Sequence, residues 1–191
     1  MSEMALERQR EFTVTEYHGM VEAGIIAHDE RVELLEGRVV EMPPIGLRHW
    51  NRHATIVAYL NATLANRALV VGQGSFPLGT RSEPQPDIAI LPCRSYETAG
   101  LPPQPTDIYA VIELADSSLR TDLGLKLKLY ARHGIADYVV VDLEGDRLLY
   151  HTEPHALGYR KTTVLERGGA FALSALPSVT LSATPFLRPE T

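Results

Sequence analysis

Two acids of this chain are placed where a hydrolytic metal site would need them. Asp87 opens the apolar run Ile88–Leu91, and Glu113 lies inside the run Tyr109–Leu114. Short apolar runs bounded by proline and turn residues favour buried strands over helices. A carboxylate in such a strand is costly to remove from water unless a cation or hydrogen bonds compensate it. We therefore expect one shared explanation, a divalent cation such as Mg²⁺, which uses few protein carboxylates and keeps several waters.

Lys126 is the third candidate, in a helix predicted from Thr121 to Arg132. At about 100° per residue, Lys126 projects between Leu129 and Tyr130, whereas Lys128 projects between Ala131 and Arg132. Lys126 is therefore the lysine expected to point inward. An inward ammonium could orient a water or stabilise charge on a phosphoryl group. The spacing alone also fits a salt-bridged pair of strands with a solvated lysine, because structural ion pairs are common.

Several ordered motifs, taken together, resemble the Uma-type putative restriction endonuclease family of the PD-(D/E)xK nuclease superfamily. The resemblance covers residues 11–187, nearly the whole chain. The motifs that carry it are Val32–Gly37, Pro44–Gly46 with a following histidine, Glu83–Asp87, Ile112–Leu119, Asp122–Ala131, Gly134–Ile135, Tyr138 and Asp142.

This resemblance implies a fold of the α/β (α+β) class, with a restriction-endonuclease-like mixed central β-sheet flanked by helices. Asp87 matches the motif aspartate and Glu113 the acid of the second motif, on adjacent strands with Mg²⁺ (or Mn²⁺) between them. Ala115 stands where the superfamily's general pattern places its lysine, and Lys126 matches the family's lysine on the next helix. The implied activity is metal-dependent hydrolysis of DNA phosphodiester bonds.

Three further acids are possible accessory residues. Glu33 matches a family acid and could stand near the metal, or it could be an ordinary strand glutamate on the polar face. Glu83 lies close enough in sequence to Asp87 to shift the local potential or assist the metal. Asp122 precedes Lys126 by four residues, a spacing at which helical side chains can pair.

Two histidines, His49 and His53, begin a helix predicted from His49 to Arg67. Four residues apart on one helical face, they could share a metal, or either could approach a substrate phosphate. A family histidine occurs at this helix start, and its match to one or the other stays open.

The remaining N-terminal pattern predicts a short helix over Val14–Ala23 and a hairpin turning at Glu36-Gly37. Residues Leu78–Ser82 are expected to pair with the strand of Asp87. The loop Pro92–Asp107 contains four prolines and is long enough to suggest contact with substrate beside the metal.

The C-terminal half begins with a buried strand, Tyr138–Asp142, that is expected to close a parallel strand–helix–strand unit. Runs over 147–150, 159–165 and 170–173 predict an antiparallel β-rich C-terminal extension. His151 and His155 are expected to be exposed there, away from catalysis.

The bulk composition indicates one domain over residues 11–187 and a flexible N-terminus over 1–10, since 191 residues with 45% hydrophobic content suffice for one core. No run approaches the roughly 20 apolar residues of a membrane span, and we expect a soluble, cytoplasmic protein. Cys93 is the single cysteine and is expected to be a small buried residue.

The formal charge of −6 counts against tight non-specific binding to DNA, because that affinity rests on basic side chains. It supports an alternative in which the same fold is a catalytically inactive module that binds nucleic acid or protein. Under the nuclease hypothesis, DNA is the substrate and a homodimer is expected, since two strands would be cut by one site per chain.

Overall fold

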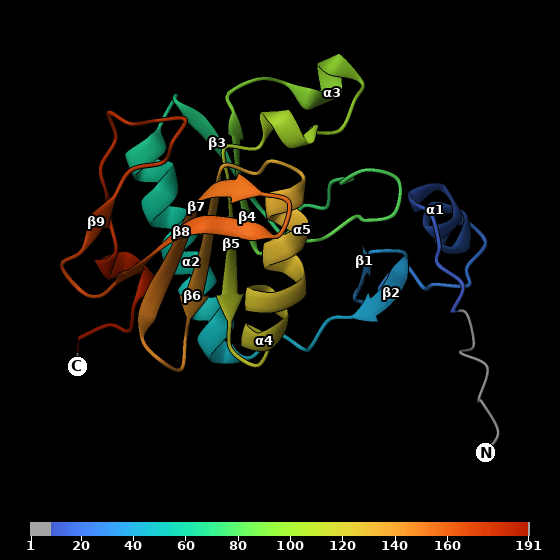
Figure 1. The fold of residues 1–191 in the computed structure, drawn as a ribbon, viewed down its shortest axis with the longest axis horizontal. Helices are drawn as coiled ribbons and strands as arrows, with labels where there is room; N and C mark the ends of the chain where they lie inside the picture. Colours follow the sequence, from blue (N-terminus) through green and yellow to red (C-terminus); the bar gives the residue numbers. More distant parts are fainter. Residues whose placement is uncertain (1–8, 191) are drawn as a thin grey trace.

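A six-stranded mixed sheet is the centre of the computed structural model, which describes residues 9–190 (Figure 1). Strands β5 and β6 pair in parallel, and the other neighbours in the order β3-β4-β5-β6-β7-β8 pair antiparallel. The predicted mixed sheet with an antiparallel C-terminal part is confirmed. The strands are β3 (Ala68–Gly72), β4 (Ile88–Pro92), β5 (Ala110–Ala115), β6 (Asp137–Asp142), β7 (Arg147–His155) and β8 (Gly158–Leu165).

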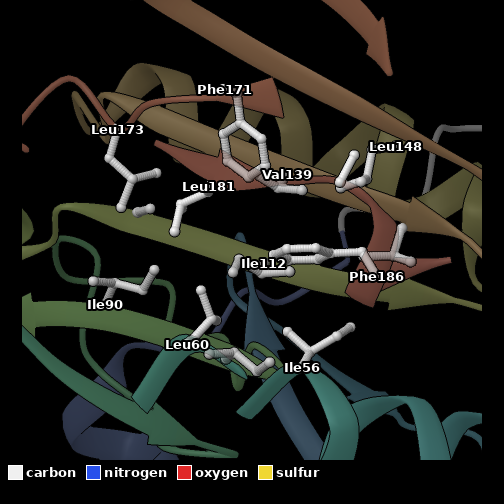
Figure 2. Packing of buried hydrophobic residues seen from close by; sticks show 14 of the residues in the cluster. Ile56, Leu60, Ile90, Ile112, Val139, Leu148, Phe171, Leu173, Leu181 and Phe186 are labelled. Atoms are coloured by element: carbon white, nitrogen blue, oxygen red, sulfur yellow. The ribbon is translucent and has the colours of Figure 1, made fainter. Parts of the chain in front are cut away.

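Helices cover both faces of the sheet, which explains the near-continuous burial of β4, β5 and β6 (Figure 1). Alternate residues of each strand face opposite layers, so Ile112 packs with helix α2 (Leu47–Leu64) while Val111 packs with helix α5 (Leu127–Arg132). Ile56 and Leu60 of α2, the sheet residue Ile112 and side chains of the C-terminal segment pack in one hydrophobic cluster (Figure 2). That segment contains β9 (Ala170–Phe171), β10 (Leu181–Ser182) and the 3₁₀ turn η3 (Thr184–Phe186).

The N-terminal part forms α1 (Val14–Glu22) and a hairpin of β1 (Val32–Leu35) and β2 (Arg38–Glu41). Thr13 and Glu16 form the predicted capping box at the start of α1. A single bridge between Leu34 and Glu83 attaches the hairpin to the chain just before Asp87. The expected pairing of Leu78–Ser82 with the Asp87 strand is wrong, because both edges of β4 are taken by β3 and β5.

The proline-rich loop Pro92–Asp107 contains α3 (Tyr96–Ala99) and the 3₁₀ turn η1 (Pro105–Asp107). It joins the end of β4 to the start of β5, whereas Asp87 precedes β4 and Glu113 lies near the end of β5. The loop is therefore at the opposite end of these strands from the two acids, and the expectation that it lies beside the metal site is wrong. Cys93 in this loop is exposed, which corrects its predicted burial.

Asp137 connects the sheet to the C-terminal segment. Its fully buried carboxylate accepts hydrogen bonds from the hydroxyl of Tyr150 and from the backbone N and Oγ of Ser174, at 2.9 Å and 3.1 Å for the two serine donors. At the turn after β6, Asp142 accepts from the backbone N of Gly145 at 2.8 Å, as expected of a strand-end cap. None of the helices in the described range 9–190 is long and apolar enough to cross a membrane.

His151 on β7 is buried, which corrects the prediction that it is exposed. Its ring stacks on Tyr138, with ring centroids 5.7 Å apart, and its Nδ1 lies 2.9 Å from Thr162 Oγ1. Its Nε2 is buried without a hydrogen-bond partner among the described residues. This burial lowers the pKa of His151 to about 4.

We predict that His151 makes stability depend on pH between about 6.5 and 4. The unfolded chain binds this proton below pH ~6.5 and the folded chain only near pH 4, so stability is complete above 6.5 and is lost as the pH falls. Between pH 7 and pH 4.5, urea unfolding should show that wild type loses about 2–3 kcal/mol more stability than His151→Gln, because the other titrating groups act equally in both proteins. His28→Gln, at an exposed position, should retain the loss. An equal pH dependence in wild type and His151→Gln would contradict this assignment.

Candidate active site

Asp87 and Glu113 lie side by side because of the register between β4 and β5. Ile88 pairs with Ile112 in this antiparallel ladder, so the next position pairs Asp87 with Glu113. The backbone N of Leu114 donates to Asp87 Oδ2 at 2.7 Å, and the backbone N of Asp87 lies 3.3 Å from Glu113 Oε2. The sheet thus holds both carboxylates on the face covered by α5.

Lys126 reaches these acids from a helix that contains a π-helical turn. The turn η2 (Asp122–Lys126) separates the short α4 (Leu119–Thr121) from α5. Lys126 Nζ lies 3.1 Å from Glu113 Oε1 and 3.0 Å from Glu33 Oε1. The side chains of Lys126, Glu113 and Glu33 are only 6%, 4% and 5% exposed. The structure therefore places Lys126 in contact with Glu113 and with Glu33, in an almost fully desolvated cluster.

Glu33 comes from β1 and is not on a solvated polar face. Both of its carboxylate oxygens are engaged, since Oε1 contacts Lys126 and Oε2 accepts from the backbone N of Gln85 at 3.1 Å. The hairpin thus contributes a carboxylate that holds the lysine.

The two histidines contact different groups of Asp87. His49 Nε2 lies 3.1 Å from Asp87 Oδ1, whereas His53 Nε2 lies 3.0 Å from the backbone O of Asp87. His49 therefore faces the carboxylate itself, and His53 supports the main chain behind it. Because the two rings engage separate groups, this arrangement does not make them co-ligands of one ion.

Asp122 and Glu83 have partners outside the acid pair. Asp122 is buried and accepts from Ser118 Oγ at 2.6 Å, so the predicted pairing with Lys126 is replaced by the contacts of Lys126 with Glu33 and Glu113. The carboxylate of Glu83 contacts His18 Nε2 at 2.8 Å and accepts from Ser75 Oγ at 3.1 Å.

A cavity of about 560 Å³ opens onto this cluster. Its lining includes the apolar residues Val40, Met42, Pro43, Pro44 and Ile45, from β2 and the segment that leads to α2. It also includes the acids, with Asp116, Ser117, Ser118 and Thr121 from the end of β5 and the start of the helix. The volume is in the range of pockets that take a small ligand or one unit of a polymer.

Burial and the neighbouring carboxylates raise the pKa of both Glu113 and Asp122. Burial raises the pKa of Glu113 well above its usual range, with Lys126 opposing and Asp122, Asp87 and Glu33 adding to the rise. Burial likewise raises the pKa of Asp122 to about 6, with Lys126 and Ser118 opposing. Burial alone would lower the pKa of Lys126, but Glu113 and Glu33 raise it, so the ammonium stays charged. The site holds more negative than positive charge and favours an added cation.

The donor set fits a hard divalent cation held by two carboxylates. Within residues 9–190, no three His, Cys, Asp or Glu side chains are grouped so that they could hold a metal ion by themselves. Asp87 Oδ2 and Glu113 Oε1 accept from backbone or buried donors. Asp87 Oδ1 lies 3.1 Å from His49 Nε2 and Glu113 Oε2 lies 3.3 Å from the backbone N of Asp87, so each of these oxygens has one contact and keeps lone-pair capacity for a cation. Mg²⁺ commonly binds through one or two carboxylates and completes its shell with waters and substrate oxygens.

Tyr130 is a residue of the site that the sequence pattern did not single out. Its hydroxyl donates to Glu113 Oε1 at 2.9 Å. It occurs in the chain as one more apolar-face residue of a helix, and the only signal was its position four residues after Lys126, one helical turn along. Arg31 and Ser118, which also line the cavity, were missed because they come from a loop and a helix start without chemical pattern.

The order of strands, the helices on both faces and the adjacent acids define a restriction-endonuclease-like fold. A solved structure shares it: the crystal structure of a putative nuclease belonging to DUF820 from Anabaena variabilis ATCC 29413 superposes with a TM-score of 0.70. The two proteins are 16% identical, and the match covers 92% of this chain and 97% of that chain. At this identity the likeness shows the fold alone.

The chain belongs to the Uma2 family, described as putative restriction endonuclease, whose sequence profile matches residues 14–184. The family resemblance expected from the motifs is confirmed. No curated protein matches the chain. Family and fold together support a nuclease, of a class that generally uses divalent metal ions.

We predict that Lys126→Met destabilises the fold by about 3–5 kcal/mol at pH 7, because it leaves two buried carboxylates unpaired. Lys128→Met, two residues along the same helix but exposed, should stay within about 0.5 kcal/mol of wild type. The unpaired carboxylates raise their folded-state pKa, so the Lys126→Met deficit should shrink as the pH falls toward 4.5. Equal unfolding free energies for the two variants would show that the buried lysine is not needed to compensate the acids.

Proposed function

We propose that this protein is a Mg²⁺-dependent (or Mn²⁺-dependent) endonuclease that hydrolyses DNA phosphodiester bonds, with Asp87, Glu113 and Lys126 as its catalytic residues. One observation carries the proposal: Asp87 just before β4, Glu113 on β5 and Lys126 on the following helix all line one cavity, with Lys126 Nζ 3.1 Å from Glu113 Oε1. Desolvated charges of this kind are costly, and a catalytic or ion-binding role accounts for that cost.

Asp87 and Glu113 would hold the ion through Asp87 Oδ1 and Glu113 Oε2, the oxygens that Leu114, Lys126 and Tyr130 do not contact. When bound, such an ion polarises phosphoryl oxygens and lowers the pKa of a coordinated water. Lys126 places a fixed positive charge beside Glu113, where it can orient the attacking water or stabilise charge on the phosphoryl group. His49, 3.1 Å from Asp87 and lining the cavity, is placed to approach a substrate phosphate.

Cleavage of supercoiled plasmid, single-stranded DNA and RNA with Mg²⁺ or Mn²⁺ tests this proposal, with wild type compared to Asp87→Asn and Glu113→Gln. We expect wild type to cut DNA and each variant to lose at least about 10²- to 10³-fold in rate, the scale of removing one electrostatic group from an active site. Asp107→Asn is the matched control, because Asp107 pairs with Arg94 at the far end of the strands.

Full activity in Asp87→Asn or Glu113→Gln would overturn the site. The alternative function, a catalytically inactive module that binds nucleic acid or protein, is supported by the net charge of −6. It would be favoured if wild type bound DNA without cutting it. Trp50 is the only tryptophan of the chain, is 61% exposed and follows His49 on α2, so its fluorescence is a direct probe of such binding.

We also propose that residues 11–187 form one domain and that two copies associate. The two hydrophobic clusters share the central sheet, which supports the first proposal. Cutting both strands of a duplex with one site per chain motivates the second. Sedimentation velocity should show a dimer at working concentration, and a species of monomer mass throughout the concentration range would remove the dimer.

A further inference from the structure

Tyr130 lies at the base of the proposed site and is completely buried. Its ring packs against Tyr138, with ring centroids 5.0 Å apart, so the phenol has a fixed position in the core. Its hydroxyl points away from these apolar contacts and donates to Glu113 Oε1 at 2.9 Å. The tyrosine therefore contacts a proposed metal-binding carboxylate from the side opposite to the cavity.

The two side-chain donors to this carboxylate use the same oxygen. Lys126 Nζ lies 3.1 Å from Glu113 Oε1, the atom that also accepts from Tyr130. The other oxygen, Oε2, is approached at 3.3 Å by the backbone N of Asp87, at the long limit of a hydrogen bond. The two donors thus set the rotation of the carboxylate and direct Oε2 toward Asp87.

We propose that Tyr130 is a positioning residue, which holds Glu113 so that a single oxygen, Oε2, is presented to the cation. This inference rests on the proposed function. Lys126 cannot do this alone, because its side chain is flexible and its ammonium is shared between Glu113 and Glu33. A rigid phenol locked in the core has a fixed direction, and hydrogen bonds from outer residues commonly orient carboxylate ligands in this way.

A purely structural role for Tyr130 makes a different prediction. If the hydroxyl only satisfies its own hydrogen bond in the core, its removal changes stability and leaves the affinity for metal unchanged. If it positions Glu113, its removal weakens metal binding even in a fully folded protein. Metal affinity, measured without any nucleic acid, therefore separates the two roles.

Mn²⁺ binding should be measured by titration calorimetry on wild type, Tyr130→Phe and Tyr159→Phe. The phenylalanine at 130 keeps the ring and its packing and removes the hydroxyl alone. We expect Mn²⁺ to bind Tyr130→Phe about 10- to 100-fold more weakly, the usual effect of losing a partner of a metal ligand. Tyr159→Phe is the matched control, because the Tyr159 hydroxyl donates to the backbone O of Ile135 at 2.8 Å, outside the site. It should bind Mn²⁺ like wild type.

Equal Mn²⁺ affinity in wild type and a folded Tyr130→Phe would overturn the positioning role while leaving the proposed nuclease intact. Wild type that binds no Mn²⁺ would overturn the proposed metal site and this role with it. A second measurement uses 3-fluorotyrosine in the wild-type chain, with Tyr130→Phe to assign the signal of Tyr130 among the eight tyrosines: Mg²⁺ should shift this ¹⁹F resonance. Bound Mg²⁺ without such a shift would also contradict the proposal.

Discussion

The ion cluster of Lys126 with Glu33 and Glu113 is the interaction on which this structure depends. Its three members come from the N-terminal hairpin, the central sheet and the helix that covers it, and all three are almost fully removed from water. Each charge would be costly alone, and together they are tolerable because the single ammonium contacts both carboxylates and offsets one of their two negative charges. The cluster therefore ties three separate parts of the chain together at the cavity, in addition to the bridge between Leu34 and Glu83 and the packing of Leu35 in the core.

The sheet supplies the second constraint, because register decides which side chains meet. With Ile88 opposite Ile112, the acids face each other on one side of the sheet. A slip of one residue would turn one of them to the other face, against the apolar residues of α2 and the C-terminal segment. The apolar residues on either side of Asp87 and Glu113 thus protect the alignment of the charges, since any other register would expose them or bury a carboxylate among them.

Much of this arrangement could be predicted from the sequence. The short apolar runs of β4, β5 and β6 predicted the strands, and the helical phase of residues 121–132 predicted the inward direction of Lys126, because both signals are local. The π-helical turn could not be predicted, since it is a defect of one residue within an otherwise regular pattern. His151 was misjudged for a related reason: a polar residue on a late strand looks solvent-facing until the stack of Tyr138 and Tyr159 around it is known.

The partners of the site were harder to predict than its members. Glu33 was recognisable as an acid, but its contact with Lys126 spans about half the chain and depends on how the hairpin docks. Asp122 had the spacing to pair with Lys126. In the structure Lys126 instead contacts Glu33 and Glu113, and Asp122 accepts a hydrogen bond from Ser118. Local spacing shows which contacts are possible, and the tertiary fold decides which of them form.

Ala115 occupies a buried strand position that bears on where the lysine of the site can come from. It stands two residues after Glu113, where the general pattern of the superfamily has its lysine, and it is buried with Tyr130 and Val140. Once a helix supplies the ammonium, this strand position is free to become part of the hydrophobic packing. A lysine at Ala115 would have to enter a closed apolar layer, where an unpaired charge is costly. In this fold the helix therefore supplies the ammonium beside Glu113, and the strand position serves the hydrophobic packing.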